Sequence, residues 1–196
     1  MTSQRHNTES ATPRDGYLDA ARACILDVGW RRTTLTEVAR RADVSRMTIY
    51  RAWPDMPALL ADLMTREWTG VVAGHVVERT ATPEGVADAV VATVAALRDN
   101  ELFTRIVELD PELVLPYLFS RRGRSQELIV GLLAEAIRAG QAADSVRAGD
   151  PVLLARSLVL ACHGFVLSAH TMVDDEVDLP ALDAELHTQL TRSLQP

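Results

Sequence analysis

The segment from Thr33 to Trp53, TTLTEVARRADVSRMTIYRAW, decides the fold of this chain. Thr34 stands three residues before Glu37, which is the spacing of a capping box, so a helix is expected to begin here. Ser45 is a residue type that often begins a helix, and it predicts the start of a second one. Asp43 lies between them, where a sharp turn needs a residue that tolerates the left-handed backbone. The segment therefore predicts two short helices joined by a tight turn.

The apolar residues of this segment fall at helical spacing and leave a polar surface. Leu35, Val38 and Ala39 form a stripe on the first helix, while Ile49 and Trp53 face inward from the second. The other surfaces of the second helix carry two arginines, a methionine, a threonine and a tyrosine. This arrangement indicates a helix-turn-helix, which places its second helix in the major groove of DNA. On the pattern alone, an ordinary helical hairpin with solvated arginines stays open as the alternative.

On both sides of this segment the pattern continues, and residues 14–60 as a whole resemble the N-terminal domain of the TetR family of one-component bacterial transcriptional regulators. The sequence departs from the family pattern at Asp43, where glycine is usual, and at Met47, where a small residue is usual. Ala52 replaces a histidine or tyrosine that commonly touches phosphate, and Met56 replaces a common lysine. The matching segments are YLDAA at 17–21, GW at 29–30, TLTEVA at 34–39, ADVS at 42–45, TIYRAW at 48–53 and ALL at 58–60.

The resemblance implies sequence-specific binding of double-stranded operator DNA through the helix-turn-helix. We predict that Thr34, Thr48 and Tyr50 contact phosphate and that Arg46 and Arg51 reach bases or phosphate. The two arginines can also supply the charge that the departures from the family pattern remove. The full predicted DNA-binding set is Thr34, Thr36, Arg46, Met47, Thr48, Tyr50 and Arg51.

Charge is distributed unevenly along the chain, although the net charge of the 196 residues is −7. Residues 1–56 contain nine arginines against seven acidic residues, whereas residues 57–196 contain eleven against twenty. A mildly basic head on an acidic body orients itself on a duplex, because the attraction to phosphate is local. With 47% hydrophobic and 5% aromatic residues and no long alternating runs, the composition predicts an all-α protein.

The remaining sequence is expected to form helices separated by short junctions. We predict a disordered N-terminal arm at 1–13, a three-helix DNA-binding domain at 14–56 and a helical effector-binding and dimerisation domain at 57–196. Gly140 is expected to stop a helix, and the stretch from 111 to 120 is expected to be irregular. In the last domain helices are expected at 57–79, from 83 to near 100, and at 102–109, 125–139, 151–172 and 181–194.

The helix expected at 151–172 is apolar on nearly every face. Such a helix has to be covered on all sides, and a chain of this size has few elements left to cover it. A second copy is the simpler cover, and in the TetR family the last two helices form the dimer interface. We therefore expect a homodimer through residues 151–172 and 181–194, with two reading helices one duplex turn apart.

The body between residues 57 and 170 is then expected to hold an effector pocket for a hydrophobic small molecule. Each candidate lining residue can also be ordinary core, and His163 in particular reads equally as a core histidine with its hydrogen bonds satisfied. A ligand that prefers one tilt of the connecting helix would change the separation of the two reading helices. The predicted lining is Trp68, Leu97, Phe103, Tyr117, Phe119, Cys162, His163 and Phe165.

Other classes of function find no support in the sequence. Paired carboxylates, a nucleophile with its base and a phosphate loop do not stand out, so no enzyme, catalytic residue or cofactor is expected. The histidines lack metal-ligand spacing, so no metal is expected. Neither a membrane span nor a signal peptide is expected, which favours the cytoplasm. The alternative to a ligand-released repressor is a ligand-independent DNA-binding or architectural protein.

Overall fold

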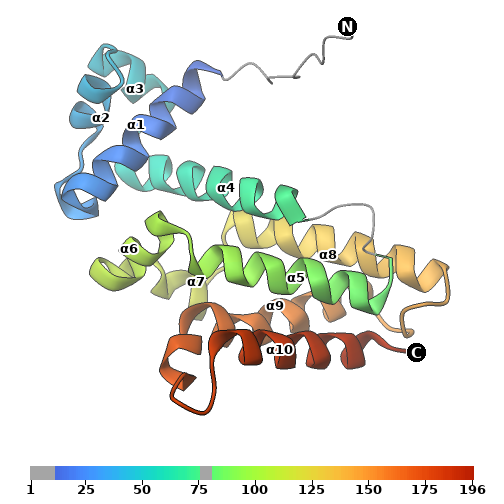
Figure 1. Ribbon diagram of the computed structural model, residues 1–196. Helices are drawn as coiled ribbons and strands as arrows, with labels where there is room; N and C mark the ends of the chain where they lie inside the picture. The colour runs from blue at the N-terminus through green and yellow to red at the C-terminus, as the bar shows by residue number, and fades with distance from the viewer. Residues whose placement is uncertain (1–11, 76–80) are drawn as a thin grey trace, which may run out of the picture.

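The computed structural model describes residues 12–75 and 81–196, and within these residues the fold is entirely helical, which confirms the predicted fold class (Figure 1). Three short 3-10 helices are η1 (Trp30–Arg32), η2 (Pro111–Leu113) and η3 (Ala169–Met172). The α-helices are α1 (Pro13–Val28), α2 (Leu35–Arg41), α3 (Arg46–Ala52), α4 (Met56–His75), α5 (Pro83–Arg98), α6 (Glu101–Leu109), α7 (Leu115–Phe119), α8 (Arg124–Ala142), α9 (Pro151–Leu167) and α10 (Leu179–Leu194).

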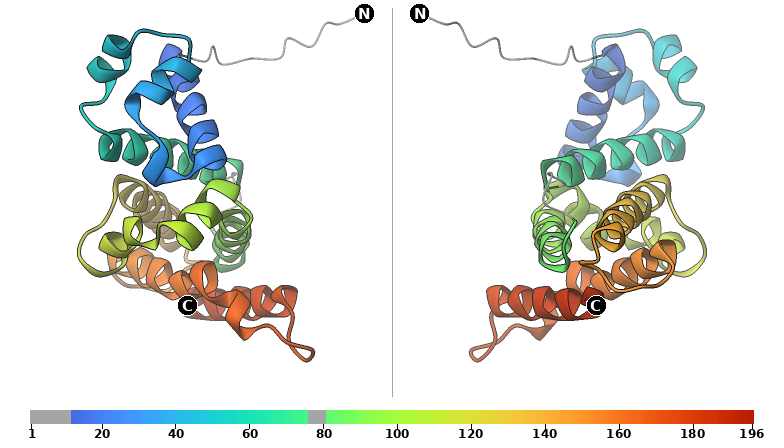
Figure 2. Two further views of the ribbon diagram at one scale, coloured as in Figure 1. Left: turned by 90° about the vertical axis from the view of Figure 1, so that its left-hand side faces the viewer. Right: turned by 90° about the vertical axis from the view of Figure 1, so that its right-hand side faces the viewer.

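The helices form a head, made of α1, α2 and α3, and a larger body that α4 joins to it (Figures 1 and 2). The head lies at one end of the molecule. Beneath it, α4 runs along the body and contacts α5 and α8. Farther from the head, α8 packs against α9 and α5 packs against α10. As a result α10 lies on the side of the molecule opposite the head.

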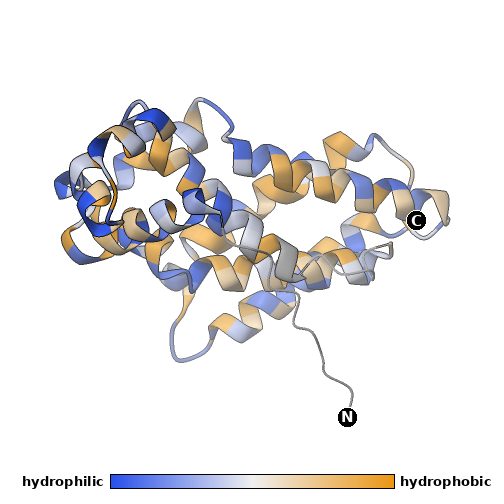
Figure 3. Cartoon of the chain, turned by 90° about the horizontal axis from the view of Figure 1, so that it is seen from above, coloured by the Kyte–Doolittle hydropathy of each residue, from blue (hydrophilic) through white to orange (hydrophobic). Residues whose placement is uncertain are grey.

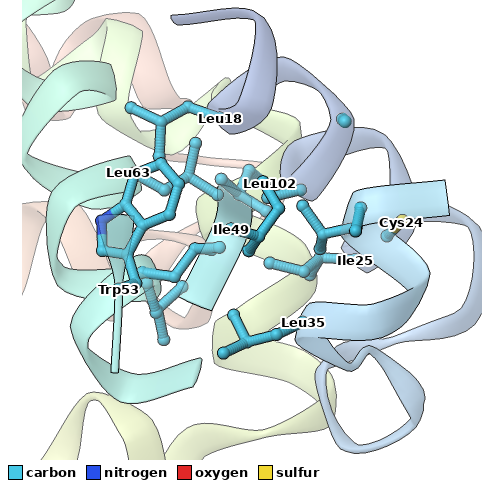
Figure 4. Close-up of a cluster of buried hydrophobic side chains, with 14 of the residues drawn as sticks. Leu18, Cys24, Ile25, Leu35, Ile49, Trp53, Leu63 and Leu102 are labelled. Atoms are coloured by element: carbon cyan, nitrogen blue, oxygen red, sulfur yellow. The ribbon is translucent and has the colours of Figure 1, made fainter. Parts of the chain in front are cut away.

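One hydrophobic core, here called the head core, holds the head together and extends beyond it (Figure 4). Ile49 and Trp53, which were predicted to face inward, are buried in it. The same core includes Leu63 of α4 and Leu102 of α6. Tyr17 of α1 meets Trp53 edge to face, with ring centroids 6.5 Å apart. The head is therefore packed on α4 and α6 through shared side chains.

A second core, here called the bundle core, is built by α5, α8, α9 and α10. Val86 of α5 and Ile137 of α8 are among its fully buried members. Seen from above, hydrophobic and hydrophilic residues alternate along the helices, as expected of amphipathic elements (Figure 3). Leu186, Leu190 and Leu194 of α10 are buried in this core, so the apolar stripe of the last helix is used within the chain.

Several predicted helix limits are wrong. The predicted stop at Gly140 is passed, because α8 continues to Ala142. Gly140 serves close packing instead: a Cβ there would collide with the Val146 side chain and lie 2.8 Å from the Ala81 carbonyl oxygen. The helix expected at 151–172 ends at Leu167 and is followed by η3. The stretch expected to be irregular contains η2 and α7.

The predicted N-terminal arm and the end of the predicted connector helix fall largely outside the described residues. Residues 1–11 and 76–79 belong to these parts, and the predictions for them stay untested. Thr12 and Pro13, which were assigned to the arm, begin α1. The Thr12 hydroxyl accepts from the Asp15 N–H, and the Asp15 carboxylate accepts from the Thr12 N–H at 2.8 Å, so a capping box fixes this helix start.

Candidate functional site

The helix-turn-helix forms at the positions that the sequence predicts. Thr34 Oγ1 accepts a hydrogen bond from the Glu37 N–H at 3.2 Å, which caps α2. Ser45 Oγ accepts one from the Thr48 N–H at 3.2 Å, which caps α3. Asp43 between them has a φ of 53°, in the left-handed region that favours glycine. Local interactions therefore fix both starts and the turn of the motif.

One surface of α3 carries four of the predicted DNA-binding side chains. Arg46, Met47, Tyr50 and Arg51 are exposed on this seven-residue helix. Met47 and Tyr50 keep 62% and 49% of their surface accessible, although both are large and mainly apolar. Ile49 turns the opposite way, into the head core. The helix therefore presents a mixed cationic and apolar surface, which suits contact with bases and sugar-phosphate backbone.

The three predicted threonines differ in how accessible they are. Thr34 and Thr36 are exposed at the start of α2. Thr48 is half-buried, and its hydroxyl lies 2.9 Å from Ser45 Oγ. A hydroxyl in that position can still donate to a phosphate while it accepts from the serine. All seven predicted DNA-binding residues thus belong to α2, α3 or the cap between η1 and α2.

Carboxylates pair with both arginines of α2. Arg41 pairs with Asp27 of α1 at 2.6 Å, and Arg40 pairs with Glu37 at 2.6 Å. The Glu37 carboxylate is turned toward Arg40, so only the threonine half of the predicted capping box forms. These two arginines are therefore less available to DNA than unpaired ones.

Three other arginines of the head have no acidic partner within the described residues. Among residues 12–75 and 81–196, Arg32, Arg46 and Arg51 make no ion pair, and all three are exposed. Sequence analysis selected the last two and missed Arg32, which ends η1 two residues before the capping Thr34. The sequence does hold an indication of it, because two consecutive arginines, Arg31 and Arg32, stand directly before the predicted helix start. Arg32 is thus a further candidate for phosphate contact beside α2.

The body contains a second candidate site, a cavity of about 350 Å³. Residues of α4, α5, α6, α7, α8 and α9 line it together with η1 and η2, and most of them are apolar. On α4 the lining runs from Pro57 to Val72, so it begins close to the head. Trp68 and Phe103 stand edge to face with ring centroids 5.0 Å apart. The size and the apolar walls are typical of a small-molecule site.

The cavity brings together most of the predicted lining residues and misses two. Phe119, at the end of α7, is 80% exposed and does not line it, and Phe165 packs against the bundle core. Each lies two residues after a lining residue, Tyr117 or His163, and two helical positions turn a side chain by roughly 200°. The predicted residues that do line the cavity are Trp68, Leu97, Phe103, Tyr117, Cys162 and His163.

Sequence analysis also missed the charged part of the lining. Arg121 and Arg124 border the cavity, together with Gln126 and Glu112. From the sequence, the arginines at 121–124 read as a solvated loop. Their contact with the cavity depends on where α8 begins relative to α4, and no local pattern indicates that.

The histidine and the cysteines of the interior carry no charge. Burial lowers the pKa of His163, so its imidazole is neutral at neutral pH. Burial raises the pKa of Cys162 to about 12 and also raises that of Cys24. Both cysteines are free and buried, and a protonated thiol is a poor nucleophile. The two thiols therefore act as small apolar side chains here.

Metal and membrane chemistry find no further support in the described part of the chain. Among these residues no group of three histidine, cysteine or acidic side chains is placed to hold a metal ion. His163 and His170, which were expected on one helix, lie on α9 and η3. In the same residues, no helix combines enough length and apolar character to cross a bilayer.

The apolar surface of α9 is divided between the core and the outside. Leu154 and Leu158 are buried in the bundle core. Leu153 and Leu160 are 64% and 66% exposed. The predicted all-round apolarity therefore leaves one face without cover from the described part of the chain. This face, here called the outer stripe of α9, consists of Leu153, Ser157, Leu160, Ala161 and Gly164.

Comparisons with known proteins agree with this architecture. Residues 18–63 match the family model for bacterial regulatory proteins of the tetR family. The chain is 35% identical over 169 residues to an HTH-type transcriptional regulator of Mycobacterium tuberculosis, across 86% of this chain and 87% of the relative. Among solved structures, TylP of Streptomyces fradiae matches with a TM-score of 0.66 and 21% identity, over 96% of this chain and 89% of that one. The SmeT–triclosan complex matches with a TM-score of 0.60 and 24% identity, over 94% and 92%.

Proposed function

The chain belongs to the tetR family of bacterial regulatory proteins, and from this premise we propose that it is a repressor whose homodimer leaves a palindromic operator when an apolar small molecule binds. Family membership makes it a DNA-binding transcriptional regulator and not an enzyme. The cavity of about 350 Å³ carries the proposal, because a ligand-independent or architectural DNA-binding protein needs no such cavity. Such a repressor acts in the cytoplasm, where bacterial DNA lies.

Two proteins of the same fold support a repressor that responds to a small molecule. SmeT is the repressor of a multidrug efflux pump of Stenotrophomonas maltophilia, and it forms a complex with triclosan. Another, FrrA, is a flavonoid-responsive regulator. Both names refer to small apolar or aromatic molecules, and both proteins cover more than nine tenths of this chain in the comparison. The fold is therefore compatible with regulation by such molecules.

The proposed DNA contacts come from α3 and the start of α2. Arg46 and Arg51 are exposed and unpaired within the described residues, so they can take guanine edges or phosphates without first breaking an ion pair. The hydroxyls of Thr34 and Tyr50 can donate to phosphate, and Arg32 adds charge beside them. Thr36, Met47 and Thr48 complete the proposed contact surface.

The proposed dimer forms through the outer stripe of α9 together with α10. Leu153 and Leu160 leave apolar surface exposed on one face of the chain. A second copy related by a two-fold axis covers the same stripe on both subunits at once. Since α10 lies opposite the head, a dimer formed there leaves both copies of α3 free for DNA.

Release from the operator is proposed to pass through α4. The cavity touches this helix from Pro57 to Val72, and α4 begins at Met56, shortly after α3 ends at Ala52. A ligand that prefers one tilt of α4 changes the separation of the two reading helices, by a coupling free energy of about 1–3 kcal/mol. Operator DNA must then weaken ligand binding by the same factor.

The test is operator binding by fluorescence anisotropy, with palindromic duplexes from the DNA that flanks the coding region. Each of Arg46→Ala and Arg51→Ala is expected to cost about 1–3 kcal/mol. Arg40→Ala is the matched control, because that guanidinium is held by Glu37. Wild-type affinity in the double variant of Arg46 and Arg51 would mean that α3 does not read the operator. If the operator affinity of the wild type did not respond to any apolar compound that raises its Tm, the ligand-independent alternative would hold.

A further inference from the structure

The cavity has a cationic side and an apolar side. Arg121, in the loop before α8, and Arg124, the first residue of α8, line it and are exposed. Most of the lining residues on α5 and α9 are aliphatic, and Val94 and Leu158 among them are buried. An occupant therefore meets guanidinium groups on one side and branched aliphatic side chains on the other, which suits an amphiphilic molecule.

The acidic residue in the lining does not cancel this charge. The Glu112 carboxylate is held by Arg31 at 2.8 Å, and this bond holds its pKa below the usual range. In the part of the chain that the structure describes, Arg121 makes no ion pair, and its guanidinium lies 5.1 Å from the centroid of the Tyr117 ring. The N-terminus of α8 adds partial positive charge, since Gly123 supplies no side-chain cap.

Asp62 of α4 connects Arg124 to the head. Its Oδ1 accepts a hydrogen bond from Arg124 Nη2 at 2.7 Å. Its Oδ2 accepts from the indole Nε1–H of Trp53 at 2.8 Å and from the guanidinium of Arg14. Burial opposes ionisation of Asp62, but these hydrogen bonds and the charges of Arg124 and Arg14 outweigh it and hold its pKa below the usual range. One carboxylate thus serves two guanidinium groups and the residue that follows α3.

We propose that the cavity binds an apolar carboxylic acid of the alkanoic type, whose carboxylate is held by Arg121 and takes Arg124 away from Asp62. This inference rests on the proposed function and names its ligand class. The Arg124 guanidinium can donate to the ligand carboxylate in place of Asp62, because arginine–carboxylate pairs are charge-assisted and can be bidentate. The alkyl chain lies among the side chains of α5 and α9. When Arg124 moves, its hydrogen bond to Asp62, which joins α8 to α4 beside Trp53, is broken. The helix α4 is then free to change its tilt.

The experiment compares decanoate with decanamide, which has the same chain and a neutral head group. Calorimetry on the full chain, below the micelle concentration of decanoate, is expected to give about tenfold or tighter binding of the acid. The double variant Arg121→Gln with Arg124→Gln removes both guanidinium groups of the cavity and is expected to remove this preference. Arg122→Gln is the matched control, because Arg122 is an exposed arginine of the same loop that does not line the cavity, and the preference is expected to persist.

A second variant tests the competition for Arg124. Asp62→Asn removes the competing carboxylate charge, so decanoate is expected to bind several-fold more tightly while decanamide binds unchanged. No gain for decanoate in this variant would overturn the exchange. A preference for the acid that survives in the double variant of Arg121 and Arg124 would overturn the placement of the head group.

The outcomes separate this inference from the proposed function. Equal affinity for decanoate and decanamide, or no binding of either, overturns the carboxylic acid as ligand class. If a neutral apolar compound still weakened operator binding in that case, the ligand-released repressor would stand with a different ligand. If no compound did so, both would fail.

Discussion

The head core is filled by side chains from α1, α2, α3, α4 and α6, and it meets the cavity of about 350 Å³ at Leu60 and Ile106. The bundle core borders the same cavity more extensively, through buried residues of α5 and α9. Protein interiors are normally packed as densely as organic crystals, so an empty volume of this size distinguishes the space between the two cores from the interior of the head. The comparison separates two tasks. The filled head core holds α2 and α3 in place, and the cavity leaves room for the proposed ligand beside α4.

Matched leucine truncations test this difference and should show its largest effect. Leu102→Ala is expected to lower the free energy of unfolding by about 2–5 kcal/mol, because Leu102 is fully buried in the head core. Leu133→Ala is expected to cost less, since Leu133 is only partly buried and already borders the cavity. Urea denaturation followed by circular dichroism measures both. Equal losses would show that the cavity wall is packed as tightly as the head core.

The next prediction concerns the outer surface of the same body. Leu160→Glu is expected to weaken the proposed dimer by about 2 kcal/mol or more and to leave the fold of each chain intact, because Leu160 is 66% exposed. Leu158→Glu is expected to unfold the chain, since Leu158 is buried in the bundle core. Light scattering measures the mass and circular dichroism the fold. A folded dimer in the Leu160 variant would place the interface elsewhere.

The sequence predicts the head well because the information that forms it is local. The caps at Thr34 and Ser45, the turn at Asp43 and the inward Ile49 are each set by residues within a few positions. The contribution of Leu102 to the same core depends on a contact between α6 and α1. No periodicity in either segment indicates that contact, so the extent of the head core emerges only in three dimensions.

The cavity is predicted less well because residue type alone does not give direction. Large apolar residues such as Trp68 and Phe103 do line it. Phe119 and Phe165 are of the same type and do not, since the rotation of a short helix decides which way they point. Arg124 is the opposite case: its charge suggests solvent, whereas the position of α8 beside α4 makes it part of the lining.

A smaller effect is expected in the body, where the half-buried His163 should make the stability of the chain depend on pH. Burial lowers the pKa of His163 from its ordinary value of 6.5, so below that pH the unfolded chain binds a proton that the folded chain does not. The stability that the neutral imidazole allows is therefore present above pH 6.5 and is lost as the pH falls toward the folded-state pKa. When the pH is lowered from about 7.5 to 5.5, the Tm of His163→Gln is expected to fall less than the Tm of the wild type. Parallel Tm curves would mean that His163 is as solvated in the folded chain as in the unfolded one.

The smallest expected effect concerns the turn of the head. Asp43 has a φ of 53°, a conformation that glycine adopts without strain, whereas Ala42 has a φ of −78° in the right-handed region. Asp43→Gly relieves this strain but makes the unfolded chain more flexible, so the free energy of unfolding is expected to rise by no more than about 1 kcal/mol. Ala42→Gly adds flexibility and also removes a methyl group that packs against the head core, so it is expected to lower the free energy of unfolding by about 0.5–1 kcal/mol or more. Urea denaturation of the two variants gives opposite signs if the turn is strained. If both variants instead lost the same free energy of unfolding, aspartate would fit this turn as well as glycine does, and the departure from the family pattern at position 43 would cost the head no stability.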